Sequence, residues 1–290
     1  MILNLFRRKF IALVMLTLTS FGLINWLRNK RRYHEYAILY TSDIHLSLSQ
    51  GRWKNLTQKF LDFLETRPDL KEYILFVNGD YIDCAYLENG IVKGGNQEYQ
   101  TQETNLFISS TKNKFKNVLY NFGTGHDFGS IEIAEKLTQT KRMGSYQWGN
   151  VKIIWFTVFP AAFGNAKALK DDEYLLLNKS LINSKNVLLM THIPLSTKAS
   201  YELGKWSNGT NLTIPASDQL YEILKNHKSS LLAIFQGHIH EEYKTSIFGI
   251  PVFCFPFIIN NSYCEILQSQ DKLEIVSSNN SKLNHSFNLS

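Results

Sequence analysis

Five of the eight histidines in the sequence directly follow short apolar runs that are typical of β-strands. In layered α/β folds, ligands bind beyond the carboxyl ends of the strands, so we expect these imidazoles to converge there with two aspartates at other strand ends. Imidazole and carboxylate ligands together favour Zn, Fe or Mn over Ca or Mg alone. Any one of these histidines by itself would more often be a core or turn residue, but the joint pattern indicates a metal site. The residues concerned are Asp43, His45, Asp80, His126, His192, His238 and His240.

Two of the motifs have an Asp or His two residues before a His. In an extended backbone alternate side chains point to the same side, so Asp43 and His45 are expected to face one ion, as are His238 and His240. The glycines before Asp80 and His238 are expected to allow tight turns and close approach of the backbone. For Asp83, two interpretations stay open: it orients a metal ligand, or it is a helix cap or a solvated carboxylate.

Short β-rich runs alternate with helical patterns along the chain, which predicts an α/β layered domain. Two closing strands near the end of the chain suggest that the sheet is paired with a second one. Helices are expected over 53–64 and 130–139, and a third is expected to be capped by Ser217. Strands are expected over 36–40, 73–77, 118–122, 151–158, 187–190, 231–235, 247–255 and 263–267.

In their order along the chain, these motifs resemble those of the calcineurin-like metallophosphoesterase superfamily, from about Tyr36 to Phe255. The resemblance implies a four-layer α-β-β-α sandwich of two mixed sheets with a two-metal site at the strand ends. It also implies the role of each residue. Asp43, His45 and His240 would hold the first metal, Asp80 would bridge both metals, and His192 and His238 would hold the second. His126 would be the acid or charge-stabilising residue, oriented by Asp127.

The third motif departs from the pattern of the superfamily. It is usually Gly-Asn-His-Asp/Glu, in which the Asn amide oxygen binds the second metal, but the chain reads Gly123-Thr124-Gly125-His126-Asp127. We expect Asn121 to point elsewhere, so that Thr124, a backbone carbonyl or water replaces the missing ligand. Because every charged and imidazole position is kept, the expectation is two divalent ions (Mn, Fe or Zn) in a working site whose second metal is bound more weakly.

Residues 1–32 differ in composition from the rest of the chain. They contain seven of the 31 basic residues and no acidic residue, so the formal charge of +6 belongs to this segment and the remainder is nearly neutral. A nucleic-acid-binding surface is therefore not indicated. The 18 uncharged residues 10–27 are long enough to cross most of a bilayer, which favours a single-pass anchor over a cleaved signal peptide. Both flanks are basic, so the side of the membrane stays open.

The expected organisation is thus an anchor over 1–32, a metallophosphoesterase domain over 33–276 and a frayed polar tail over 277–290. The expected function is hydrolysis of a phosphate mono-, di- or pyrophosphate ester by metal-activated hydroxide. The anchor suggests a lipid-linked substrate. The alternatives are a nucleotide-lipid pyrophosphatase of the lipid-A-pathway type and a weakened family member that serves as a binding or scaffold module. The loop after His192 is either a surface loop or a substrate-binding segment, with Tyr201, Lys205 and Trp206 as candidate contacts.

Overall fold

The strand-forming runs of the sequence are buried on both faces, and this places them at the centre of two stacked sheets. The computed structural model describes residues 34–48, 54–84, 86–88, 91–93, 96–123, 130–158, 168–197, 213–258 and 260–289. Residues 36–290 form one compact unit. All five residues of the strand Ile74–Asn78 are buried, as are all five of the strand Val187–Thr191. Such continuous burial is typical of parallel strands that are covered on both sides.

The first sheet has six strands in the order β14-β13-β12-β1-β2-β5. Strands β1, β2 and β5 are parallel, so their carboxyl ends lie at one edge. The other three strands extend the sheet by antiparallel pairing. The bounds are β1 Tyr36–Thr41, β2 Ile74–Asn78, β5 Asn117–Asn121, β12 Cys264–Gln268, β13 Lys272–Ser277 and β14 His285–Asn288.

The second sheet also has six strands, in the order β10-β11-β9-β8-β7-β6. Its four central strands β11, β9, β8 and β7 are parallel, with an antiparallel strand at each edge. The bounds are β6 Met143–Trp148, β7 Val151–Phe156, β8 Val187–Thr191, β9 Leu231–Gln236, β10 Tyr243–Ile247 and β11 Ile250–Cys254; a separate hairpin pairs β3 Tyr86–Glu88 with β4 Ile91–Lys93.

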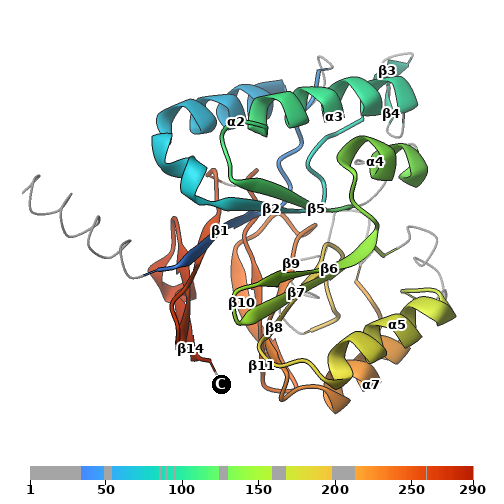
Figure 1. Ribbon diagram of the computed structural model, residues 1–290. Helices are drawn as coiled ribbons and strands as arrows, with labels where there is room; N and C mark the ends of the chain where they lie inside the picture. Colours follow the sequence, from blue (N-terminus) through green and yellow to red (C-terminus); the bar gives the residue numbers. More distant parts are fainter. Residues whose placement is uncertain are drawn as a thin grey trace, which may run out of the picture. The chain divides into compact units, whose positions relative to one another are not determined.

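Helices cover the outer face of each sheet, which gives four layers (Figure 1). Helices α2, α3 and α4 lie over the first sheet, and α5 and α7 lie over the second (Figure 1). This confirms the predicted two mixed sheets with outer helices. The bounds are α2 Lys54–Thr66, α3 Gln97–Thr111, α4 Ile131–Thr138, α5 Asp171–Ile182 and α7 Gln219–Asn226, with short 3₁₀ helices η1 at Pro68–Glu72 and η3 at Ser281–Leu283.

Alternate side chains of the same strand belong to different apolar cores. In β2, Ile74 and Phe76 pack between the two sheets, whereas Leu75 packs under α2 and α3. In β7, Ile153 packs between the sheets and Ile154 packs under α5 and α7. The period of two residues in a strand therefore builds three cores from one set of apolar runs.

Two details of the local predictions are wrong. The helix α7 is capped by Asp218, whose carboxylate accepts a hydrogen bond from the Leu220 backbone N–H at 2.8 Å, and not by Ser217. The single strand expected over 247–255 is interrupted by a two-residue turn at Phe248 and Gly249, which both have positive φ (53° and 84°). This turn conformation matches the twist of a β-hairpin, so β10 and β11 pair as a hairpin.

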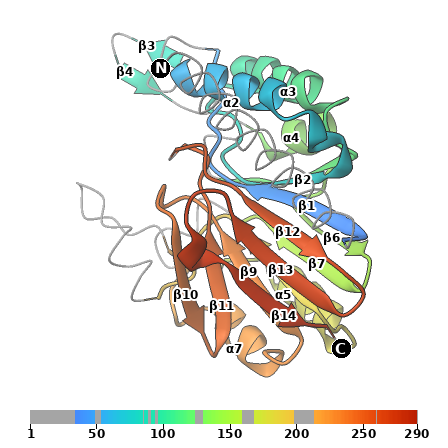
Figure 2. The ribbon, with the colours of Figure 1, turned by 90° about the vertical axis from the view of Figure 1, so that its left-hand side faces the viewer.

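The expectation of a frayed polar tail over 277–290 is also wrong. Strand β14 pairs with β13 along the outer edge of the first sheet (Figure 2). Just before it, Leu283 is 6% exposed and packs into the core between the sheets. The polar composition of this segment reflects an edge strand with one exposed face, since apolar residues alternate with exposed polar ones.

In the part of the chain that the structure describes, no helix combines the length and the apolar character needed to cross a bilayer. The predicted membrane-spanning segment, residues 10–27, lies outside the described residues.

The C-terminal strand leads to a prediction about stability. Replacing Leu283 with Ala should lower the free energy of unfolding by about 2–4 kcal/mol, because it leaves a cavity in the core between the sheets. Ser286→Ala on the exposed face of β14 is the matched control and should change it by less than about 0.5 kcal/mol. Urea unfolding measures both. Equal, small effects would mean that this segment does not pack as described.

Candidate metal centre

The candidate ligands lie on loops that leave the carboxyl ends of β1, β2, β8 and β9. The sequence predicts an extended backbone at these residues, but the structure does not have one. Asp43, His45, Asp80, His238 and His240 all have positive φ, between 48° and 70°. Non-glycine residues adopt this region rarely and at a cost of about 1–3 kcal/mol each. Asp43 and His45 still direct their side chains to one group of donors, but His238 and His240 belong to two different groups, so the expectation that this second pair faces one ion is wrong.

Neighbouring loops hold each other in this conformation by backbone hydrogen bonds. The Asp43 N–H donates to the Gly79 carbonyl at 3.0 Å, and the His45 N–H donates to the Asp80 carbonyl at 2.9 Å. The loop after β1 is thus fixed directly to the loop after β2. From the second sheet, the His238 N–H donates to the Asp43 carboxylate at 3.0 Å.

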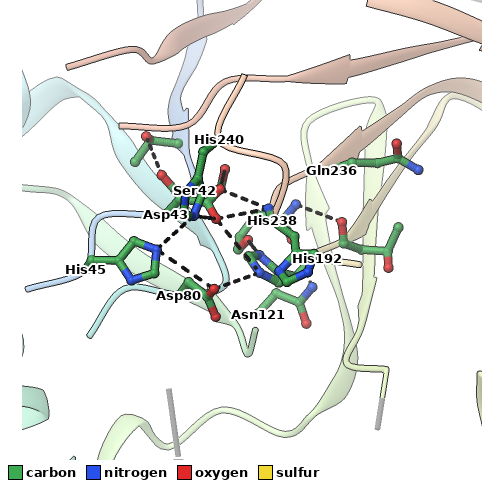
Figure 3. Close-up of polar contacts among 12 residues, drawn as sticks. Ser42, Asp43, His45, Asp80, Asn121, His192, Gln236, His238 and His240 are labelled. Atoms are coloured by element: carbon green, nitrogen blue, oxygen red, sulfur yellow. Dashed lines mark hydrogen bonds and ion pairs between the residues drawn. The ribbon is translucent and has the colours of Figure 1, made fainter. Parts of the chain in front are cut away.

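A first group of side chains consists of Asp43, His45, Asp80 and His240, with one donor atom of each within 4.8 Å of the others. The Nε2 atoms of His45 and His240 are 3.1 Å apart. His240 Nε2 lies 3.4 Å from Asp43 Oδ1, and His45 Nε2 lies 3.9 Å from Asp80 Oδ2. Figure 3 shows these side chains pointing toward one another from different loops.

A second group consists of Asp80, His192 and His238, and it shares Asp80 with the first group. His192 Nε2 is 3.2 Å from Asp80 Oδ2 and 3.9 Å from Asp43 Oδ1. The Asp80 carboxylate therefore lies between the two groups, as expected for a bridging ligand (Figure 3). All six residues proposed as metal ligands are brought together.

Two further contacts orient the imidazoles. The Nδ1 atom of His192 is 2.7 Å from the backbone carbonyl of Asn78, which leaves Nε2 facing Asp80. The Nδ1 atom of His45 is 3.7 Å from Oδ1 of Asp83, a carboxylate that is only 2% exposed. A hydrogen-bonded partner such as the Asn78 carbonyl fixes the tautomer and the ring orientation of a ligand histidine, whereas at 3.7 Å Asp83 acts on His45 by charge rather than through a hydrogen bond. For Asp83 this favours the orienting interpretation over that of a solvated carboxylate.

Two glycines provide the space that His192 occupies. A Cβ on Gly79 would lie 2.3 Å from His192 Nδ1, and a Cβ on Gly237 would lie 2.6 Å from the same atom. Gly79 also has a φ of 83°, which a side chain would disfavour. The expectation that these glycines permit close approach of the backbone is confirmed.

Beneath the site, a buried hydrogen-bond network joins the two sheets. The Asn78 side-chain amide donates to Tyr40 Oη and to the carbonyls of Thr191 and Phe235. Asn121 donates to Asn78 Oδ1 at 2.9 Å and accepts from Thr157 Oγ1 at 3.0 Å. Asn121 is thus engaged between the sheets, as expected, and the sequence analysis missed Asn78, whose only signal was its position before Gly79.

Electrostatics in the site keep the donors in the forms that bind cations. Burial by itself would raise the pKa of Asp43, but His192 and His240 outweigh it and lower that pKa to about 2. Burial lowers the pKa of His238 to about 3, and the nearby His192 acts in the same direction. At neutral pH Asp43 is therefore ionised and His238 is neutral, the forms in which carboxylate and imidazole bind metals.

Comparison with known proteins agrees with this geometry. The family model for the calcineurin-like phosphoesterases matches residues 36–242. The chain belongs to the calcineurin-like phosphoesterase family. This confirms the predicted enzyme class, a hydrolase that acts on phosphoester bonds.

Solved structures of two phosphatases and of one protein named as an anchor share the fold of this phosphoesterase. A dimetal phosphatase from Danio rerio superposes with a TM-score of 0.59 at 9% identity, covering 89% of this chain and 100% of the other. A purple acid phosphatase from yellow lupin (Lupinus luteus) seeds superposes with a TM-score of 0.58 at 13% identity, covering 88% of this chain and 53% of the other. GAP50, the anchor in the inner membrane complex of Plasmodium, superposes with a TM-score of 0.54 at 11% identity, covering 88% of this chain and 89% of the other. A comparison with curated protein sequences finds no match.

The donors of this phosphoesterase fit a pair of divalent cations. Asp43 is 0% exposed and Asp80 is 1% exposed. Within the described residues, the partners of the Asp43 carboxylate are Ser42, imidazoles and a backbone N–H, with no Lys or Arg among them. Buried carboxylates require compensation by partners or metals, and oxygen together with imidazole nitrogen suits Mn, Fe or Zn.

Some of the predicted site residues lie outside the described residues. They are Thr124, His126 and Asp127 of the third motif and the candidate substrate contacts Tyr201, Lys205 and Trp206. Their roles remain predictions.

The pKa of His238 leads to a prediction for the metal-free phosphoesterase. In the unfolded chain this imidazole takes up a proton near its ordinary pKa of about 6.5, but in the folded protein it does so only near pH 3. The unfolded state thus binds more protons in this window, so stability should fall as the pH drops from 7 toward 4.5. Urea unfolding of chelator-treated protein measures this slope, and His238→Gln should flatten it. Equal slopes would contradict the prediction.

Gly237 provides a test of the packing around His192. In Gly237→Ala the new Cβ should displace the imidazole from the Asn78 carbonyl, lowering metal affinity about 10–100-fold, as expected for loss of an orienting contact. Gly249→Ala is the control, because a Cβ there meets open space although φ is 84°. It should reduce stability without changing metal affinity, which isothermal titration with Mn²⁺ can measure. An unchanged affinity in Gly237→Ala would contradict the proposed role of His192.

Proposed function

We propose that this protein hydrolyses phosphate esters at the centre formed by Asp43, His45, Asp80, His192, His238 and His240, with two divalent cations. The observation that supports this most directly is that two donor groups share the Asp80 carboxylate. A carboxylate has two oxygens, so one side chain can serve two cations whose spacing in two-metal hydrolases is about 3.5–4 Å. Asp43, His45 and His240 would hold one cation, and His192 and His238 the other.

Each residue of the chain has a defined task in this proposal. Asn78 and Asp83 keep the Nε2 atoms of His192 and His45 directed at the centre. His240 is 22% exposed whereas Asp43 is fully buried, so solvent and substrate approach from the His240 side. The bound cations supply Lewis-acid activation of water and of the phosphoryl oxygens. His126, held by Asp127, would donate a proton to the leaving oxygen or stabilise its charge.

We propose that the substrate is a phosphate mono-, di- or pyrophosphate ester that is linked to a lipid. The support is the uncharged segment 10–27, which would hold the protein at a membrane surface. The near-neutral charge of the remaining chain does not favour nucleic acid. Tyr201, Lys205 and Trp206 are the proposed substrate contacts, and a nucleotide-lipid pyrophosphatase of the lipid-A-pathway type is one enzyme that would fit.

A second candidate function is a binding or scaffold module with weakened catalysis. The observation that favours it is the third motif, in which the Asn next to His126 is missing while Asn121 is engaged by Asn78 and Thr157. One structure with the same fold is named for an anchoring role. Turnover and metal binding distinguish the two candidates.

The catalytic proposal is tested with p-nitrophenyl phosphate and its bis ester in the presence of Mn²⁺, Zn²⁺, Fe²⁺, Co²⁺ or Ni²⁺. Asp80→Asn should lower kcat/KM more than about 100-fold. Replacing a residue that only contacts a metal ligand already lowers metal affinity or activity about 10–100-fold, and Asp80 is itself a proposed ligand. Asp62→Asn makes the same chemical change on the exposed face of α2 and should have no effect. Turnover with none of the metals would favour the scaffold function. Full activity in Asp80→Asn would contradict the proposed centre.

The membrane anchor has its own test. The full chain should remain in the membrane fraction after washing at high salt and at alkaline pH, because the uncharged, mostly apolar segment 10–27 would be held in the bilayer by the hydrophobic effect. A variant without residues 1–32 should be recovered in the supernatant with its phosphoesterase activity intact. Release of the full chain by either wash would contradict an integral anchor.

A further inference from the structure

The helix α3 buries polar side chains where a helix over a sheet would ordinarily bury apolar ones. Gln100, Glu103, Thr104, Phe107 and Thr111 follow a helical spacing along one face, and all five are buried with exposures of 0–1%. Burying a carboxylate or an amide costs free energy unless hydrogen bonds replace those made to water. The contacts of Gln100 and Glu103 therefore indicate what this face of the helix holds.

The carboxylate of Glu103 joins two of the loops that carry proposed metal ligands. Its Oε1 accepts from the Leu48 backbone N–H at 2.7 Å. Its Oε2 accepts from the backbone N–H groups of Cys84 at 2.8 Å and Asp83 at 3.3 Å. Leu48 lies three residues after His45, and Asp83 lies three residues after Asp80. One side chain thus fixes both loops just beyond their ligands.

The amide of Gln100 holds the segment that follows the third motif. Its Nε2 donates to the Ser130 carbonyl at 2.9 Å, and its Oε1 accepts from the Ser130 N–H at 3.2 Å. Ser130 is four residues after His126 in the sequence and caps α4. Gln100 and Glu103 are one turn apart, so a single rigid helix contacts three loops at the site edge of the first sheet.

We propose that Glu103 and Gln100 are positioning residues of the metal centre, with Glu103 setting the spacing of the Asp43–His45 and Asp80 loops and Gln100 fixing Ser130, which follows the third motif in the sequence. This rests on the proposed function of the centre. Five of the six ligands have strained left-handed backbones, and strain of this kind persists only where surrounding contacts fix it. The ionised carboxylate suits three N–H donors because both its oxygens only accept, whereas an amide would turn an NH₂ group toward one of them. Burial raises the pKa of Glu103 to about 7, and the N–H groups of Leu48 and Cys84 oppose this by stabilising the ionised form.

The test compares Glu103→Gln with Asp218→Asn, a matched control. Asp218 is also a buried carboxylate that accepts three hydrogen bonds, from Ala168 N–H, Leu220 N–H and Tyr174 O–H, but it contacts none of the six proposed ligands. Both variants should lose stability in urea unfolding. Only Glu103→Gln should also lose affinity for Mn²⁺, by about 10–100-fold. It should also alter the visible absorption of the Co²⁺-substituted protein and speed hydrogen exchange of the Leu48 and Cys84 amides.

Two further variants keep the test decisive. Leu48→Pro removes one donor to Glu103 at a side chain that is 47% exposed, and it should weaken Mn²⁺ binding in the same direction even where Glu103→Gln fails to fold. Gln100→Leu should lower kcat with little change in Mn²⁺ affinity, because it affects only the segment after His126. Glu98→Gln, on the exposed face of α3, should change neither kcat nor the affinity for Mn²⁺.

The outcomes separate the two proposals. If the wild-type protein binds no Mn²⁺ or Co²⁺, the proposed function fails and this inference fails with it. If the wild-type protein binds metal and Glu103→Gln and Leu48→Pro bind it equally well, the proposed function stands and the positioning role is overturned. Equal losses of affinity in Glu103→Gln and Asp218→Asn would also overturn it, since the effect would then follow from stability alone.

Discussion

Asp43 and Asp80 place two carboxylates in the interior of the protein, fully or almost fully shielded from water. Removing an ionised carboxylate from water costs several kcal/mol even after the protein relaxes. Here the compensation comes from imidazoles, a serine hydroxyl and the backbone N–H of His238. His192 and His240 lower the pKa of Asp43 to about 2 although burial opposes it. A pocket of buried carboxylates lined by imidazoles is the environment that a divalent cation stabilises further.

The two sheets must be held in register for this arrangement to exist, because Asp43 and Asp80 follow strands of the first sheet whereas His192, His238 and His240 follow strands of the second. The polar network around Asn78 does this in the region where both sheets end. Its side chain bonds to both sheets, and its backbone carbonyl orients His192. Polar contacts are directional, so they fix the offset between two sheets more narrowly than apolar packing alone.

Membership of the family supports the type of reaction but does not by itself identify the substrate. Membership of the calcineurin-like phosphoesterases and the shared fold support hydrolysis of a phosphoester. Further features of this chain lie around that centre: a third motif without the Asn of the superfamily pattern, an Asn121 engaged between the sheets, and a helix α3 whose buried face is polar. In the proposed function, these features rather than the shared ligands would set substrate choice and the strength of the second metal site.

The sequence by itself determined the six proposed ligands and the strands that place them, since strands buried on both faces are continuous apolar runs and their ends are marked by Asp, His and Gly. It also indicated the enzyme class, because the order of the motifs is specific. It did not reveal α3, because Gln100, Glu103 and Thr104 occupy the buried face and remove the apolar period that marks a helix. It misjudged residues 277–290 for a related reason, since an edge strand with one exposed face has a largely polar composition. The left-handed backbone of the ligand loops, the role of Asn78 and the contacts of Glu103 were decided only by tertiary structure. They depend on hydrogen bonds between segments far apart in the chain, and no local pattern of residue types encodes those partners.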